Sequence, residues 1–181
     1  MVKLKFFITK PNYVILIAGG VGMFQVGDKI FYPIHGAGII EAIEEKNFLG
    51  ENHLYYVLNM LLRELHIMVP VEKISSLGIR QIVDSTVMER VLASFHEGEP
   101  EVMANANLRF RINTDKLKSG DIHAAAEVIR ELLWISKQKG LGTGERMMLD
   151  HAQQVFMSEL ALVKGIDAEE AFDLLRQAIE H

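Results

Sequence analysis

The chain is predicted to be an α+β protein of two domains, a small SH3-like or Tudor-like β barrel followed by an all-α bundle. Residues 24–80 contain short runs of β-branched and aromatic residues separated by turn formers, whereas apolar residues after 82 recur at helical spacing. We expect the barrel domain to span 23–80 and the helical domain 84–181. With 49% hydrophobic and 24% charged residues, the 181-residue chain can bury one good core or two small ones.

Four runs in the N-terminal part have the composition of strands. They are Lys29–Tyr32, Gly38–Ile43, Leu54–Met60 and Leu65–Pro70. Turn formers separate the runs, at Pro33 with His35–Gly38 and again at Leu49–Asn52. Gly36 and Gly38 are expected to supply backbone angles, or close approaches, that a Cβ atom would forbid. Four or five strands in so short a segment favour a barrel.

The helical part is predicted to contain four helices that share one core. Their start signals lie at Asp84, Ser119–Asp121, Thr143 and Asp167, and Asp167 forms a capping pair with Glu170. The first helix is expected to stop near Gly98–Pro100 and the second at Gly140–Gly144. Apolar stripes follow the second helix at Ile122, Ala126, Ile129 and Leu133, and the third at Leu149, Ala152, Phe156, Leu160 and Val163.

We expect the first 22 residues to be a leader outside the fold. Lys3, Lys5 and Lys10 precede the apolar run Tyr13–Gly22, a pattern that a weak signal peptide would share. The run is too short to span a bilayer, and no clear small-x-small cleavage site follows it. The alternative is that translation starts at Met23, with the leader an upstream misread start or a vestigial extension.

Cysteine content and charge narrow the classes of function. The chain has no cysteine, which excludes disulfides, thiol nucleophiles and cysteine-ligated zinc, and leaves the cytoplasm as the default location. The net charge of −5 argues against strong binding of nucleic acid through bulk electrostatics. Any contact with DNA must therefore be local or be delivered by a partner.

A basic region lies within residues 105–146, which contain eight Lys or Arg against five Asp or Glu. Four of these cations lie around Phe110, ahead of a predicted helix start: Arg109, Arg111, Lys116 and Lys118. Such cations suit phosphates, because they attract and position DNA without reading its sequence. An ordinary solvated face has the same composition, and charge alone favours that interpretation.

Patterns typical of enzymes, metals and cofactors are absent from the sequence. The seven histidines are scattered, without a His-x-x-x-His pair or a His-Glu-x-x-His motif. Gly140–Gly144 joins two predicted helices, and no Gly-Lys-Ser/Thr follows it, so it is not a phosphate loop. Nothing marks a nucleophile elbow. We expect a non-enzymatic protein that needs no cofactor or metal.

The run Val26–Ile40, V-G-D-K-I-F-Y-P-I-H-G-A-G-I-I, resembles the opening of the CarD/CdnL transcription regulators. The N-terminal domain of that family is shared with the RNA-polymerase-binding module of transcription-repair coupling factor. Further landmarks follow in the family's order: Val69–Pro70, Arg109–Arg111, Asn113–Leu117, Ser119–Asp121, Ala126–Leu132 and Gly140–Leu149. The resemblance covers residues 23–163, and the order and spacing of the landmarks carry it.

The resemblance implies a regulator whose barrel binds the β subunit of bacterial RNA polymerase. Its polymerase-facing residues are expected to be Lys46, Arg63, Leu65, Ile67, Met68 and Val69. Lys46 stands where many members carry an arginine, although a solvated loop charge is the alternative. Met68 stands where some relatives carry a basic residue, so the contact could be weaker or could shift to Arg63 and Lys73.

The resemblance also implies that the helical domain contacts promoter DNA weakly and without sequence preference, and stabilises the open complex. Its DNA-facing residues are expected to be Ala106, Arg109, Arg111, Lys116 and Lys118, with the four cations on one exposed face. Many relatives carry a wedge tryptophan where this chain has Ala106, and alanine cannot fill a base step. Met103 or Leu108 is a lesser candidate wedge, whereas Trp134 is expected to pack in a core or between domains.

Two hypotheses therefore stay open. The first is a polymerase-bound regulator that contacts DNA, and the second is a protein-interaction module that binds polymerase or another partner without productive DNA engagement. No membrane partner is expected, and the sequence leaves the oligomeric state open.

Overall fold

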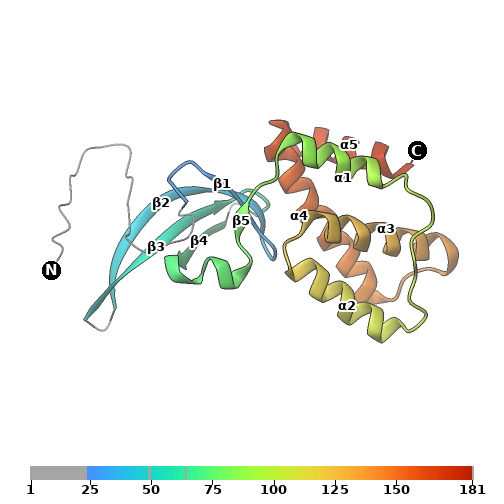
Figure 1. Cartoon of the computed structure of the whole chain (residues 1–181), viewed down its shortest axis with the longest axis horizontal. Helices are drawn as coiled ribbons and strands as arrows, with labels where there is room; N and C mark the ends of the chain where they lie inside the picture. Colours follow the sequence, from blue (N-terminus) through green and yellow to red (C-terminus); the bar gives the residue numbers. More distant parts are fainter. Residues whose placement is uncertain (1–23, 49, 64, 181) are drawn as a thin grey trace.

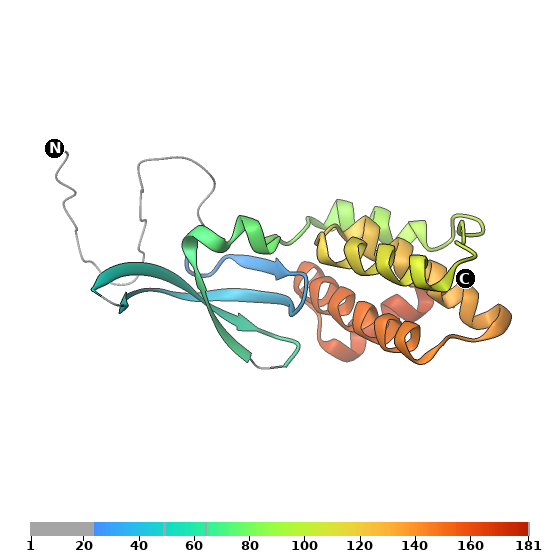
Figure 2. The ribbon, with the colours of Figure 1, turned by 90° about the horizontal axis from the view of Figure 1, so that it is seen from below.

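The computed structural model describes residues 24–48, 50–63 and 65–180, so the leader predicted for residues 1–22 lies outside the described residues. Figure 1 shows an elongated molecule with a β-sheet at one end and helices at the other, and Figure 2 shows the same division after a quarter turn. The α+β layout expected from the sequence is confirmed. None of the described helices is long and apolar enough to cross a membrane.

The sheet is antiparallel throughout. Its strands are β1 (Lys29–Tyr32), β2 (Gly36–Phe48), β3 (Glu51–Met60), β4 (Leu65–Pro70) and β5 (Arg80–Gln81), in the spatial order β4-β3-β2-β1-β5. Two short 3-10 helices, η1 (Val71–Lys73) and η2 (Ser75–Leu77), connect β4 to β5. All four predicted strands are present. Closure of this sheet into a barrel stays a prediction.

The turn between β1 and β2 is shorter than the sequence analysis expected. Gly36 and Gly38 lie inside β2 and pair with β1, and the turn closes with the His35 N–H donating to the Tyr32 carbonyl at 2.9 Å. Gly36 has φ +81°, and Gly38 approaches β3 so closely that a Cβ atom would lie 2.6 Å from the Asn59 carbonyl oxygen. Both glycines therefore have the backbone roles expected of them.

Alternation of side chains places the core of the sheet domain on one face. Tyr56, Leu58 and Met60 of β3 are buried there together with Ile30 and Ile40. The β4 residues paired with that row of β3 are Val69, Ile67 and Leu65, so they face the same side. The intervening residues of β3 and β4 point to the other side of the sheet, which we call the outward face.

The helical domain contains five helices within the described residues. They are α1 (Ser85–Ser94), α2 (Ala106–Lys118), α3 (Ile122–Lys139), α4 (Thr143–Lys164) and α5 (Ala168–Glu180). Asp84 caps α1 by accepting from the Val87 N–H at 2.8 Å. The Asp167 carboxylate accepts from the Glu170 N–H at 2.9 Å, and the Glu170 carboxylate accepts from the Asp167 N–H at 3.2 Å, as the capping-pair prediction requires.

One prediction about these helices is wrong, and one helix was not predicted. Thr143 is the first residue of α4 and not its cap, because the N-cap is Gly142, which offers no side-chain acceptor. The sequence analysis also missed α2. The buried positions of that helix are Arg109 and Asn113, so its inner face is polar and gives no apolar period.

The buried residues of the helical core come from α1, α3, α4 and α5, and Leu117 of α2 packs against them while partly buried. Val91, Ile129, Leu132, Phe156 and Leu160 are among the fully buried members of this core. The predicted stripes of α3 and α4 supply most of that core. Trp134 is partly buried against the same cluster, which confirms a packing role within the helical domain and not between domains.

Candidate functional site

Strand β4 is one edge of the sheet, because its sole strand partner in the described ladder is β3. Leu65 and Met68 are 41% and 44% exposed, and Ile67 is partly buried. Val69 is 3% exposed and faces the core, so it can offer a partner its backbone but little of its side chain. The edge therefore combines an open hydrogen-bonding row with exposed apolar groups, as strand addition by a partner requires.

Lys46 and Met68 lie on the outward face of the sheet. Lys46 pairs with His53, and Met68 pairs with Val57, two positions of β3 that share one side of the strand. The Lys46 ammonium lies 2.7 Å from the Glu44 carboxylate, and both side chains are exposed. The structure thus places Lys46 beyond the Pro70 end of β4, whereas Arg63 is exposed in the turn that precedes β4. The predicted polymerase residues form an extended band and not a compact cluster.

The four predicted DNA-binding cations do not share one exposed face. Arg109 is 2% exposed and donates from Nε to the Glu145 Oε1 atom at 2.8 Å and from Nη1 to the Met103 carbonyl at 2.5 Å. Its Nη2 donates to the same Glu145 oxygen. The expectation that Arg109 is exposed is therefore wrong, because this guanidinium satisfies a buried carboxylate.

The other members of this set face solvent to different extents. Lys116 is paired with Glu127 at 2.8 Å. Arg111 and Lys118 are exposed, and no ion-pair partner is recorded for either within the described part of the chain. Ala106, the first residue of α2, is also exposed, with the Asn105 side chain capping the helix at 3.0 Å. Arg111 and Lys118 are therefore the cations of this set that are available to a phosphate.

A second buried carboxylate fixes the segment that leads into α2. The Glu131 side chain of α3 accepts from Asn113 Nδ2 at 2.8 Å and from the Met103 N–H at 3.4 Å. Together with the Arg109–Glu145 pair, it ties α2 and the preceding loop to α3 and α4. Met103 and Leu108 are 38% and 43% exposed beside this anchor. The buried polar contacts of α2 therefore fix the position of the exposed residues on this helix and on the loop before it.

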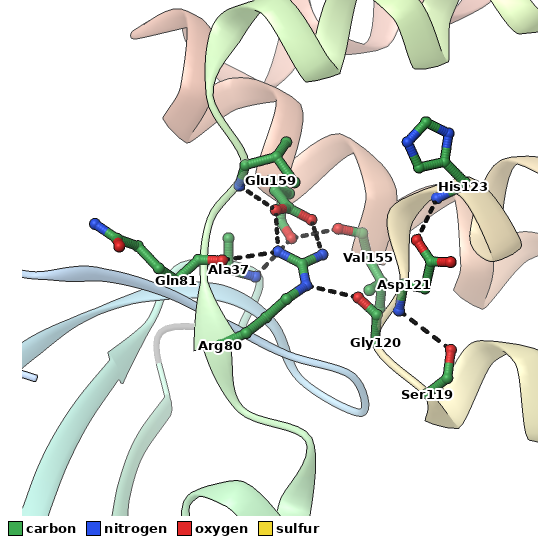
Figure 3. Close-up of polar contacts among 11 residues, drawn as sticks. Ala37, Arg80, Gln81, Ser119, Gly120, Asp121, His123, Val155 and Glu159 are labelled. Atoms are coloured by element: carbon green, nitrogen blue, oxygen red, sulfur yellow. Dashed lines mark hydrogen bonds and ion pairs between the residues drawn. The ribbon is translucent and has the colours of Figure 1, made fainter. Parts of the chain in front are cut away.

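The sheet and helical domains are joined by a network centred on Arg80 and Glu159, which Figure 3 shows. Arg80 donates from Nη1 and Nη2 to the two Glu159 oxygens at 2.6 and 2.9 Å, and from Nε to the Gly120 carbonyl at 2.7 Å. The Val83 N–H also donates to Glu159 at 3.0 Å. The Arg80 guanidinium lies 4.4 Å from the centre of the Phe31 ring.

A second bond and an apolar cluster complete this joint. The Ser158 hydroxyl of α4 accepts from the Ala37 N–H at 2.8 Å and donates to the Val155 carbonyl at 2.6 Å. Ala37 and Phe31 pack against Val155 in a small buried cluster between the domains. We call these contacts and the Arg80–Glu159 pair the domain joint, which connects the sheet domain directly to α4.

Two histidines near the joint have lowered pKa values. Burial, followed by the Arg63 charge and then His151, lowers the pKa of His35. Burial and then Arg63 lower the pKa of His151. Within the described residues, no three His, Asp or Glu side chains gather in a way that could hold a metal ion.

Comparisons with known proteins match both parts of the chain. The model described as CarD-like/TRCF RID domain matches residues 24–83, and the model described as CarD, C-terminal domain, matches residues 90–176. YdeB of Bacillus subtilis (strain 168), whose name assigns it provisionally to the transcription factors, is 46% identical over 144 residues, which are 80% of this chain and 94% of YdeB. The chain belongs to the CarD family.

A solved structure, CdnLNt from Myxoccoccus xanthus, is 34% identical in a match that covers 37% of this CarD-family chain and 94% of CdnLNt, with a TM-score of 0.30. The predicted resemblance to CarD/CdnL regulators is confirmed by the family models and by YdeB. The family is one of transcription regulators. In this CarD-family protein the first matched domain ends at Val83, within the domain joint.

Sequence reasoning missed the buried carboxylates of this CarD-family protein and the arginine of its joint. Glu145, Glu131 and Glu159 each sit among buried apolar positions of α3 or α4. An acidic residue at such a position needs a charged or hydrogen-bonding partner, so the helical period contained a usable signal. Arg80 gave no comparable signal, because its partner lies far away in the sequence.

Proposed function

We propose that this CarD-family protein binds the β subunit of bacterial RNA polymerase through its N-terminal domain and contacts promoter DNA through its helical domain, stabilising the open complex. The N-terminal domain in this proposal is a closed SH3-like or Tudor-like barrel. The protein would act in the cytoplasm, at the nucleoid, where polymerase brings it to DNA.

The observation that carries this proposal is the open edge of β4 in a domain that matches the RID family. A strand of the partner can extend the sheet by pairing with the β4 backbone. Exposed Leu65 and Met68 supply apolar contact, and Lys46 supplies a charge on the outward face. The buried Val69 contributes through its main chain.

Support for DNA contact comes from Arg111 and Lys118, which are exposed on α2 in a chain of net charge −5. Two cations alone bind DNA weakly, because each neutralised phosphate contributes little affinity at physiological salt. Attachment to polymerase raises the local concentration of DNA around the helical domain, so weak contacts suffice.

The polymerase contact is tested by binding the full chain to the purified β-subunit lobe. Lys46→Glu and Met68→Glu should each weaken binding, because both side chains lie on the outward face. Lys137→Glu, at an exposed position near the end of α3, makes the same charge change as Lys46→Glu and should leave binding unchanged. Equal binding by all variants would remove the edge of β4 and the outward face from the proposal.

The second candidate function is a protein-interaction module that binds polymerase or another partner without productive DNA contact. Two observations favour it. Position 106 holds an alanine in place of a tryptophan, and the Arg109 guanidinium is buried, so neither group is offered to DNA. Open-complex lifetime separates the two functions. The Arg111→Glu, Lys118→Glu double variant should shorten the lifetime if α2 contacts DNA, and the matched Lys137→Glu, Lys139→Glu double variant should not.

A further inference from the structure

An apolar groove of about 380 Å³ lies between α2, α4 and the β1–β2 turn. Its walls include Phe31, Leu117, Met148, Val155 and Phe156, contributed by both domains. The rim is formed by Ile34, Phe110 and Met147, which are 53%, 42% and 67% exposed. Clustered exposed apolar side chains around a hollow of this size are typical of a binding site.

One stripe of α2 connects this groove to the exposed position where relatives carry a tryptophan. Ala106, Phe110, Thr114 and Lys118 are four residues apart, so they lie along the same side of the helix. The last three of them line the groove. Phe110 is therefore one turn from Ala106 and is the exposed aromatic ring of that stripe.

Two cations at or near the groove are available to an anionic ligand. Lys118 lines it and Arg111 is exposed on the same helix, with no recorded ion pair for either among the described residues. Of the two acids in the lining, Glu159 is paired with Arg80, whereas Asp121 caps α3 by accepting from the His123 N–H and keeps its charge. His151, the remaining titratable group of the lining, has a lowered pKa and stays neutral near pH 7.

The start of α4 adds to the same preference. Gly142 caps this 22-residue helix without a side-chain acceptor, and the one acid in its first turn, Glu145, is paired with Arg109. A Cβ atom on Gly144 would lie 3.3 Å from the Phe110 ring, so that ring packs directly against the first turn of α4. A helix N-terminus attracts phosphate groups. The groove is apolar and lies beside Lys118, Arg111 and a helix N-terminus. It therefore suits a flat group that has a phosphate on either side.

We propose that this groove binds an unpaired nucleobase of single-stranded promoter DNA against Phe110, with the flanking phosphates near Lys118 and Arg111. The proposal rests on the proposed function and names the ligand of its DNA-contacting domain. Aromatic side chains stack on bases irrespective of sequence, because every base has a π face. Phe110 thereby supplies the aromatic contact that Ala106 cannot make.

The groove can be watched directly through its methionine methyl groups. The full chain, labelled with ¹³C at methionine methyls, is titrated with a single-stranded oligodeoxynucleotide and with the same sequence as a duplex. The Met147 signal should shift with the single strand, because the ring current of a bound base acts nearby. Met88 is fully buried in the helical core and serves as the internal control that should not move.

Two variants decide the assignment. Phe110→Leu retains apolar volume but removes the ring, and it should weaken single-strand binding about five-fold or more. Phe172→Leu removes an exposed ring on α5 and should have no effect. An unshifted Met147, an equal response to the duplex, or unchanged binding by Phe110→Leu would overturn the proposal. A Met147 shift caused by the polymerase lobe and not by the oligonucleotide would also overturn it, because the groove would then hold a protein side chain.

Failure of this inference can be told apart from failure of the proposed function. If Arg111→Glu with Lys118→Glu shortens open-complex lifetime while Phe110→Leu leaves both lifetime and the Met147 response unchanged, the helical domain contacts DNA but the groove takes no base. If neither variant changes the lifetime, the DNA-contacting function itself fails.

Discussion

Arg80 and Glu159 form a two-point ion pair between the sheet domain and α4, with N···O distances of 2.6 and 2.9 Å. The Glu159 side chain is 1% exposed, and both of its oxygens accept hydrogen bonds, from Arg80 and from the Val83 N–H. A buried carboxylate that loses such a partner is left with an uncompensated charge.

Removing this arginine should destabilise the whole protein. Arg80→Met is expected to lower the free energy of unfolding by about 3 kcal/mol or more, because Glu159 then stays buried and unpaired. Lys164→Met breaks the pair with the exposed Glu89 carboxylate and should cost much less than Arg80→Met. Urea denaturation of the two variants measures the difference, and similar losses would show that the joint is not stabilised by its ion pair.

Gly36 should be far less tolerant of alanine than Gly27. Both have positive φ values, +81° and +94°, so each substitution should cost about 1–2 kcal/mol from backbone strain. A Cβ atom at Gly36 would also lie 2.5 Å from the Ser158 hydroxyl, whereas nothing lies within 4 Å at Gly27. Gly36→Ala is therefore expected to lower the melting temperature further than Gly27→Ala, and equal melting temperatures would contradict the close approach of the two domains.

Arg109 should contribute to the stability of the fold and not to contacts with DNA phosphates. Arg109→Leu is expected to cost about 3–5 kcal/mol by leaving Glu145 unpaired in the interior. Arg111→Leu, at an exposed position, should change stability by no more than about 0.5 kcal/mol. The salt dependence of DNA binding adds a second readout. Losing one phosphate contact lowers the steepness of the plot of log binding constant against log salt concentration by about 0.9. That reduction is predicted for Arg111→Leu, and its appearance in a folded Arg109→Leu variant would show that Arg109 reaches DNA.

Stability should fall as the pH drops below 6.5, the ordinary pKa of histidine. His35 and His151 have lowered pKa values in the folded protein, so in this range the unfolded chain binds protons that the folded chain does not. Their contribution is fully present above 6.5 and is lost as the pH falls through the folded pKa values. Melting temperatures measured between about pH 7.5 and pH 5.5 should decline less steeply in a His35→Gln, His151→Gln variant. A decline of the same steepness in that variant would assign the pH dependence to other groups.

The elements that sequence reasoning predicted well are those with regular apolar patterns. The four strand runs, α3 and the stripe of α4 each present a period that matches their geometry, and the cap of α3 involves neighbours in sequence. Helix α2 was not predicted, because its buried residues are the polar Arg109 and Asn113. Their partners, Glu145 and Glu131, are 36 and 18 residues away, so only the folded chain brings each pair together.

The candidate site was predicted less completely for the same reason. The β4 residues could be located from their place in a strand, but the burial of Val69 depends on which face meets the core. The Arg80–Glu159 pair spans 79 residues, and nothing local to Arg80 distinguishes it from a surface arginine. Long-range polar contacts of this kind have no sequence period, so Arg80 could not be recognised in advance, although the place of Glu159 among the buried apolar positions of α4 was a signal.

The domain joint has a geometric consequence for a protein with two binding surfaces. A flexible linker would let α2 sample many distances from the edge of β4, and linker length would then set the reach of the protein along DNA. Here Arg80, Glu159, Ser158 and Ala37 hold the two surfaces at one separation. If both surfaces engage at once, the position on the promoter at which α2 arrives is fixed by the fold itself, measured from the point where polymerase holds β4.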